Sequence, residues 1–170
     1  MTAEIVSVNM SESKGTPKIP VPSARLVAGQ GIEGDSHAGP GLRQVSLLAD
    51  ESIDRMRARG FPNLPPGAFA ENLTVKGIEL WRLPVGTVLR VGDAIVLRVT
   101  QIGKKCHSGC AIFEQIGDCV MPREGIFVEV VVGGNVAKGD SVRVVRSRRH
   151  RTRFCPVAGP SCSGASKPQL

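Results

Sequence analysis

The sequence predicts a mainly β protein whose strands form a barrel, with a few short helices. Three observations indicate this fold class. Short runs rich in Val, Ile and Leu recur along the chain and are separated by turn residues. The chain has 20 Gly and 12 Pro among 170 residues, a composition that favours turns over long helices. Aromatic residues make up only 4 %, so the core has to be mostly aliphatic.

The first 60 positions contain three runs that predict strands: residues 3–9, 19–27 and 44–48. Five glycines between positions 29 and 41 predict a loop. Asp50 is the expected N-cap of a helix over residues 51–59, and Gly60 is the expected end of that helix. The sequence thus predicts one short helix between the third and fourth strands.

The rest of the chain predicts six further strands: residues 71–75, 80–83, 88–91, 95–100, 126–132 and 141–145. Three prolines predict a loop over residues 61–67, and residues 112–116 suit one or two helical turns. Turns are expected at residues 92–93, 133–135 and 139–140. So many short strands joined by tight turns favour a closed or nearly closed barrel.

The net charge of +7 belongs to the C-terminal end. Six of the 22 basic residues lie from Arg146 onward, where there is no acidic residue, and residues 1–145 have a net charge of +1. We expect one domain over residues 1–146 and a disordered tail over 147–170, basic at first and then rich in Ser, Gly and Pro. Because that tail lacks interleaved aromatic side chains, we do not expect nucleic-acid binding.

The five cysteines are an odd number in a chain without a secretory signal, which indicates reduced thiols. No stretch approaches the roughly 20 apolar residues of a membrane-spanning helix. These two features predict a cytoplasmic protein that does not enter a membrane.

Several polar residues interrupt the apolar pattern and are candidates for a binding site. Asp35 and His37 lie two apart in the glycine-rich loop, or else Asp35 caps a turn and His37 is exposed. Arg43 could clamp an anion, or it could be a surface side chain without a partner. Glu71 and Asn72 offer an acceptor and an amide, or Asn72 could satisfy backbone groups at the start of the strand.

The strongest cluster surrounds Cys106, which follows Lys104 and Lys105 and precedes His107. Neighbouring positive charges favour a thiolate, the form that binds soft metals or carries sulfur. Inert buried thiols are one alternative. Another is structural zinc held by Cys106, His107, Cys110 and Cys119, although this spacing fits zinc poorly. Arg123 is a second candidate anion clamp, unless it only pairs with Glu124.

Taken in order, these segments resemble the MOSC family, whose domains are associated with the molybdenum cofactor. The resemblance spans about residues 3–146 and rests on Gly31-Ile32-Glu33-Gly34-Asp35-Ser36-His37, Arg43-Gln44-Val45-Ser46, Glu71-Asn72-Leu73, Val85-Gly86 with Val91-Gly92-Asp93, Gly103-Lys104-Lys105-Cys106-His107, and Glu124-Gly125-Ile126-Phe127 with Gly139-Asp140. It implies a barrel-like fold that binds molybdopterin, with Cys106 as metal ligand or sulfur carrier.

In the hypothesis of a cofactor-binding module, the other polar residues are candidates for contacts with the rest of the cofactor. Four basic residues are expected at the cofactor's phosphate: Arg43, Lys104, Lys105 and Arg123. Three residues are expected at the pterin or the mouth of the pocket: Asp35, His37 and Asn72. Pyridoxal phosphate is not expected, because in the sulfurases it sits on a separate desulfurase domain that this chain is too short to hold.

Three functions follow from these observations. The first is a module for cofactor maturation, sulfur carriage or delivery, whose partner would be a molybdoenzyme or a cofactor-biosynthesis protein. The second is a molybdenum-dependent oxidoreductase that reduces N-hydroxylated compounds. The third is a β-barrel without molybdenum that has a structural zinc or a nucleic-acid role.

Overall fold

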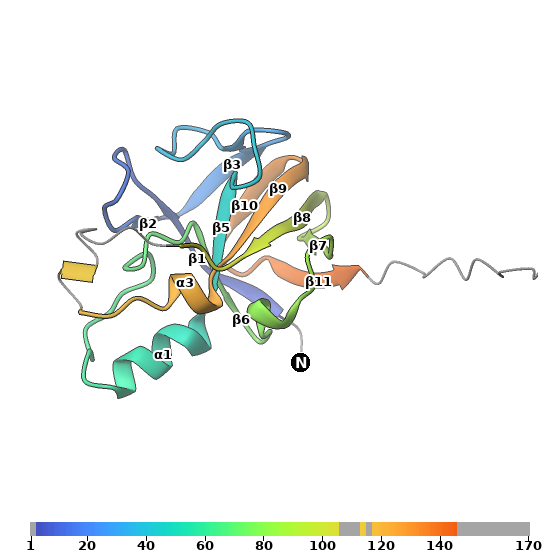
Figure 1. The fold of residues 1–170 in the computed structure, drawn as a ribbon. Helices are drawn as coiled ribbons and strands as arrows, with labels where there is room; N and C mark the ends of the chain where they lie inside the picture. Colours follow the sequence, from blue (N-terminus) through green and yellow to red (C-terminus); the bar gives the residue numbers. More distant parts are fainter. Residues whose placement is uncertain (1–2, 106–112, 115–116, 146–170) are drawn as a thin grey trace, which may run out of the picture.

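Seven strands form a closed β-barrel in the computed structural model, which describes residues 3–105, 113–114 and 117–145 (Figure 1). Their order around the barrel is β1, β11, β7, β8, β9, β5 and β6, and β6 pairs back to β1. Only β5 and β6 are parallel neighbours. Their bounds are β1 Ala3–Met10, β5 Val45–Ala49, β6 Leu73–Lys76, β7 Val88–Val91, β8 Ile95–Ile102, β9 Ile126–Val132 and β11 Ser141–Val145. The predicted barrel is therefore confirmed.

Three more short strands form a small second sheet beside the barrel, in the order β10 (Gly134–Ala137), β3 (Ser23–Val27) and β4 (Gly31–Ile32). The prediction of a single strand over residues 19–27 is wrong. Pro22 lies between β2 (Ile19–Val21), which pairs with β1, and β3, which pairs with β10. Proline has no backbone N–H to donate, and it lets the chain leave one sheet for the other.

Outside the barrel lie the helices α1 (Asp50–Ala58) and α3 (Met121–Glu124) and the 3-10 turn η1 (Leu80–Arg82). The prediction of a strand over residues 80–83 is wrong. These residues form η1 instead, and Leu80 is the residue of η1 that is buried. Asp50 is the first residue of α1 and not its N-cap, a position that Ala49 occupies. Phe113 and Glu114 are helical, and the rest of the predicted 112–116 segment lies outside the described residues.

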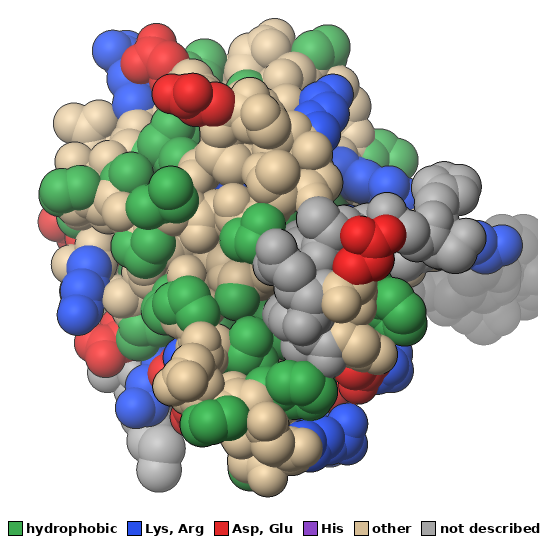
Figure 2. All heavy atoms as spheres, turned by 90° about the vertical axis from the view of Figure 1, so that its left-hand side faces the viewer, with side chains coloured by type: hydrophobic (Ala, Val, Ile, Leu, Met, Phe, Trp, Pro, Cys, Tyr) green, Lys and Arg blue, Asp and Glu red, His purple; other side chains and the backbone are tan. Residues whose placement is uncertain are grey.

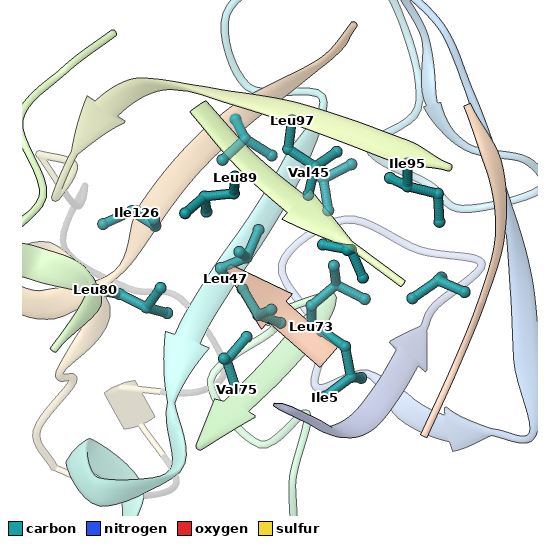
Figure 3. Close-up of a cluster of buried hydrophobic side chains, with 14 of the residues drawn as sticks. Ile5, Val45, Leu47, Leu73, Val75, Leu80, Leu89, Ile95, Leu97 and Ile126 are labelled. Carbon is teal, nitrogen blue, oxygen red and sulfur yellow. The ribbon is translucent and has the colours of Figure 1, made fainter. Parts of the chain in front are cut away.

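The core inside the barrel is aliphatic, as the composition predicts. Its buried members are all Ala, Ile, Leu or Val, and Leu47, Leu73, Leu89 and Leu97 point toward one another from four strands (Figure 3). A second cluster lies outside the barrel wall and contains Leu48, Ile53, Phe69 and Phe127. Strand β5 is buried on both faces because it lies between the two clusters. Among the described residues, no helix is long and apolar enough to span a membrane.

Candidate functional site

A cavity of about 150 Å³ brings together four residues that the sequence singles out: His37, Arg43, Asn72 and Lys104. His37 comes from the loop between β4 and β5, and the other three come from different strand ends. Arg43 precedes β5, Asn72 precedes β6, and Lys104 follows β8. Because β8, β9, β5 and β6 are consecutive neighbours in the barrel, these ends meet at one place. Met121 of α3 and Phe127 of β9 provide an apolar part of the lining.

Gly103 sets the path of the chain into Lys104. Its φ is +65°, and a Cβ atom at this position would lie 2.2 Å from the carbonyl oxygen of Pro122. Only glycine combines this backbone conformation with so close an approach. The turn after β8 can therefore pack directly on α3, which brings Lys104 to the cavity.

Arg43 is held in place by two contacts. Its Nε donates a hydrogen bond to Oε1 of Gln101 at 2.9 Å, and its guanidinium carbon lies 5.4 Å from the centroid of the Phe127 ring. Gln101 in turn donates to the carbonyl of Gly103 at 2.6 Å. Since Nε carries only one of the five guanidinium hydrogens, the terminal nitrogens can bind a ligand in the cavity.

Asn72 lines the cavity and is only 1 % exposed. Its Oδ1 accepts from the backbone N–H and the hydroxyl of Ser46, at 3.1 and 3.0 Å, and its Nδ2 donates to the carbonyl of Asn9 at 3.3 Å. The amide thus joins the starts of β5 and β6 to β1. Strand β6 begins at Leu73, so the prediction that Glu71 and Asn72 belong to it is wrong.

Glu71 supports the loop that leads to Asn72. Its buried carboxylate accepts from the backbone N–H of Gly67, from the backbone N–H of Phe69 at 3.1 Å and from the hydroxyl of Thr74 at 3.0 Å. Burial raises the pKa of Glu71, although these donors oppose the shift. Ala70, beside it, lines the cavity and adopts a positive φ of 62°.

Asp35 is not among the described lining residues, but it contacts one of them, because its Oδ2 accepts from the backbone N–H of His37 at 3.0 Å. Its carboxylate oxygens are 2.6 and 2.8 Å from Nζ of Lys18, and both side chains are buried. Burial alone would raise the pKa of Asp35, but hydrogen bonds from Lys18 and from the backbone N–H groups of His37 and Ser11 lower it. Asp35 is therefore an ionised, fully bonded anchor.

His37 lines the cavity and turns its Nδ1 toward Lys18, with 3.2 Å between Nδ1 and Nζ. Burial and the positive charge of Lys18 both lower the pKa of His37. The imidazole is consequently neutral at neutral pH. Sequence reasoning missed Lys18, because a lysine between two prolines is typical of an exposed loop.

Lys105 and Arg123 are not part of this lining. Lys105 is exposed. Arg123 lines a different cavity of about 320 Å³ between α1 and α3, where it pairs with Asp118 at 3.2 Å. Glu124 pairs with Arg55 instead of Arg123. On the face that includes α1, basic side chains are scattered among acidic and hydrophobic ones (Figure 2).

The thiols are only partly described. Cys106, His107 and Cys110 lie outside the described residues. Cys119 is buried in the second core cluster, beside α3. Within the described part of the chain, no group of three His, Cys, Asp or Glu side chains is placed to hold a metal ion.

The described lining of the cavity is cationic. Arg43 and Lys104 contribute positive charge, His37 is neutral, and no acidic side chain is among the described lining residues. A guanidinium and an ammonium group recognise oxyanions such as phosphate. The aromatic and thioether side chains beside them suit a flat organic group.

Comparisons with known proteins agree with this architecture. The family model described as MOSC domain matches residues 33–143. The fold is similar to that of YuaD from Bacillus subtilis, with a TM-score of 0.71 at 20 % identity over 85 % of this chain and 96 % of that one. YiiM from Geobacillus stearothermophilus is also similar, with a TM-score of 0.65 at 22 % identity over 84 % of this chain and 75 % of YiiM.

YiiM from Escherichia coli has a TM-score of 0.63 at 19 % identity over 86 % of this chain and 71 % of that protein. No curated protein matches the chain. At these identities the solved structures establish a shared fold, and the family model covers well over half of the sequence. The chain therefore belongs to the MOSC domain family.

Proposed function

We propose that this MOSC domain binds the molybdenum cofactor and acts in its maturation, sulfur carriage or delivery, with Cys106 as metal ligand or sulfur carrier. The observation that carries this proposal is the cationic cavity formed by Arg43, Lys104 and His37. The family is associated with molybdenum cofactor. That cofactor combines an anionic phosphate with a flat pterin, and the lining offers a partner for each part.

The size of the cavity limits how much of the cofactor it can hold. Its volume of about 150 Å³ is below the roughly 300–1,000 Å³ of typical ligand pockets. It therefore suits one end of the cofactor, and Arg43 and Lys104 make the phosphate end the better choice. The remainder of the cofactor would extend beyond the described lining.

Two cysteines lie two positions from a lining residue: Cys106 follows Lys104, and Cys119 precedes Met121 but is buried in the second core cluster. This leaves Cys106 as the candidate. The adjacent Lys104, Lys105 and His107 favour the thiolate form, which is the form that ligates molybdenum or carries sulfur. When bound, the molybdenum centre would supply redox or sulfur chemistry. The chain's own residues would bind the cofactor and orient it, for a molybdoenzyme or a cofactor-biosynthesis protein as partner.

Metal analysis of the loaded chain tests the proposal. The purified protein is incubated with cofactor released from a molybdoenzyme, separated from excess cofactor, and assayed for molybdenum and zinc by mass spectrometry. We expect about one molybdenum per chain and no stoichiometric zinc. A chain that retains zinc but no molybdenum would support a structural zinc site and contradict the proposal. Reduction of an N-hydroxylated base by the loaded chain would favour the oxidoreductase alternative over a carrier.

A further inference from the structure

A cluster of four charged or polar side chains, Lys18, Asp35, Ser11 and His37, adjoins the cavity through His37. Lys18 is fully buried, and its Nζ contacts both carboxylate oxygens of Asp35, the hydroxyl of Ser11 at 3.2 Å and Nδ1 of His37 at 3.2 Å. The backbone N–H of Lys18 donates to the carbonyl of Gly67 at 2.8 Å, which fixes the chain at this point. The ammonium group therefore has a defined position next to Nδ1 of the imidazole ring.

The chemistry of these contacts determines the tautomer of His37. A lysine ammonium group has three N–H donors and no acceptor. A proton on Nδ1 would point at this ammonium group, whose Nζ is 3.2 Å away, so the contact favours an unprotonated Nδ1. The hydroxyl of Ser36, 3.3 Å from Nδ1, can donate to the same nitrogen. A ring nitrogen that accepts carries no proton, and in a neutral imidazole the proton then resides on the other nitrogen, Nε2. The lowered pKa of His37 agrees with a neutral ring.

We propose that Lys18, anchored by Asp35, is a positioning residue that fixes His37 as the Nε2–H tautomer and makes it a neutral hydrogen-bond donor to the ligand of the cavity. The identity of that ligand rests on the proposed function, but the tautomer does not. With Arg43 and Lys104, His37 then completes a set of three donors around one cavity. Such a set of donors binds an acceptor, such as a phosphate or carbonyl oxygen. Because Nε2 already carries a proton, His37 cannot remove a proton from the ligand there.

Nitrogen-15 NMR of the imidazole in the cofactor-free protein tests the tautomer directly. At a pH above the ordinary histidine pKa of about 6.5, we expect a single form with protonated Nε2 and unprotonated Nδ1. A predominant Nδ1–H form would overturn the inference. This result does not depend on whether the chain binds molybdenum cofactor, so failure of the proposed function leaves it standing.

The double variant Lys18→Met, Asp35→Asn tests the role of Lys18, because it removes both buried charges together. We expect the Nδ1–H form to become populated and the pKa of His37 to rise. In the control Lys105→Met, which removes an exposed charge outside the lining, the imidazole should keep the parent's signals. If the folded double variant kept the single Nε2–H form, Lys18 would have no positioning role. If it does not fold, the parent's spectrum still decides the tautomer.

Two substitutions of His37 test the donor. The amide nitrogen of His37→Gln reaches about as far as Nε2, whereas that of His37→Asn reaches only as far as Nδ1. We expect His37→Gln to bind cofactor nearly as well as the parent and His37→Asn to bind roughly tenfold more weakly, the loss typical of one hydrogen bond. Equal affinity for both variants would show that His37 donates nothing to the ligand. If the parent itself binds no cofactor, the proposed function fails and the NMR result alone decides the tautomer.

Discussion

Lys18 and Asp35 form an ion pair whose side chains are almost completely buried, 0 % and 1 % exposed. Burying two charges is expensive, and such a pair is stable only when further hydrogen bonds satisfy both groups. Here Asp35 also accepts from the backbone of Ser11 and His37, each at 3.0 Å. The pair therefore holds together the end of β1, the segment before β2 and the loop that carries His37.

Replacing Asp35 by Asn should strongly destabilise the fold, because it leaves the Lys18 ammonium buried without its counter-charge. We expect a loss of about 3–5 kcal/mol in the free energy of unfolding, measured by urea denaturation. The double variant Lys18→Met, Asp35→Asn should lose less than the single one. A loss below about 1 kcal/mol for Asp35→Asn would show that the pair is not buried as described.

The same pair predicts a pH dependence. Because the pKa of Asp35 is lowered in the folded chain, its stabilising contribution is present above the ordinary aspartate pKa of about 4 and is lost as the pH falls through the folded value. The parent should therefore lose stability in acid more steeply than the double variant does. If the free energies of unfolding of the parent and the double variant fell equally steeply with decreasing pH, Asp35 would not be the source of the acid sensitivity.

Lys104 and Lys105 should differ in their effect on cofactor affinity, although the sequence alone treats them alike. Lys104 lines the cavity and Lys105 is exposed outside the lining. Lys104→Gln should weaken binding, and the loss should shrink at high salt because salt screens the attraction to phosphate. The matched variant Lys105→Gln, which removes a charge outside the lining, should weaken binding less than Lys104→Gln does. Equal losses in a binding titration would place the phosphate elsewhere.

Some site residues could be predicted from the sequence and others could not. Arg43 and Lys104 flank recognisable strands, so their position at strand ends followed from the pattern. Lys18 could not be found in this way, because its role depends on a contact with Asp35 across 17 positions that no local pattern encodes. Asp35 was expected at the pterin or the mouth of the pocket, and in the structure it contacts both Lys18 and the lining residue His37.

At the scale of elements, the turn after β8 links the barrel to α3. A Cβ atom at Gly103 would meet the carbonyl oxygen of Pro122 at 2.2 Å, whereas one at Gly139 would meet nothing within 4 Å. Both glycines have positive φ, +65° and +94°. The two positions therefore separate the effect of a close approach from the effect of backbone strain.

Gly103→Ala should be the more damaging of the two substitutions. Gly139→Ala should cost about 1–3 kcal/mol from backbone strain alone. Gly103→Ala should cost more, because α3 must also move, and it should weaken cofactor binding by displacing Lys104. Thermal denaturation and a binding titration measure the two effects. Equal destabilisation with unchanged binding would contradict this account of the turn.

Prediction succeeded for strands with continuous β-branched runs and failed where tertiary contacts decided the conformation. Strands β9 and β11 match the predicted bounds, since Val and Ile dominate both. Leu80–Arg82 has an apolar content typical of a strand but forms a 3-10 turn that buries Leu80 in the core. Strand β10 begins at Gly134, in a segment whose sequence predicts a turn. The segment forms a strand because it pairs with β3.

At the scale of the whole molecule, pairing between β1 and β11 closes the barrel, with Ala3 opposite Val142. Closure removes the open edges that a seven-stranded sheet would expose. It also fixes the strand ends that carry the cavity residues. The C-terminal boundary of the fold should therefore lie just after β11.

Deleting residues 147–170 should leave the thermal midpoint nearly unchanged, because this segment has few aliphatic side chains to contribute to a core. Deleting residues 141–170 should unfold the chain, since it also removes β11 and opens the barrel. Differential scanning calorimetry measures both. A fall of many degrees for the shorter deletion would show that residues 147–170 contribute to the fold.

The proposed role of Cys106, to bind molybdenum or carry sulfur, is tested most directly by one measurement. Molybdenum retention after cofactor loading is compared for the parent, Cys106→Ser and the control Cys110→Ser, with the thermal midpoint recorded for each. Serine keeps the shape but replaces a soft thiolate by a hard hydroxyl. We predict that Cys106→Ser loses molybdenum at an unchanged midpoint, while Cys110→Ser retains most of it. Retention by Cys106→Ser equal to that of the parent would contradict the claim.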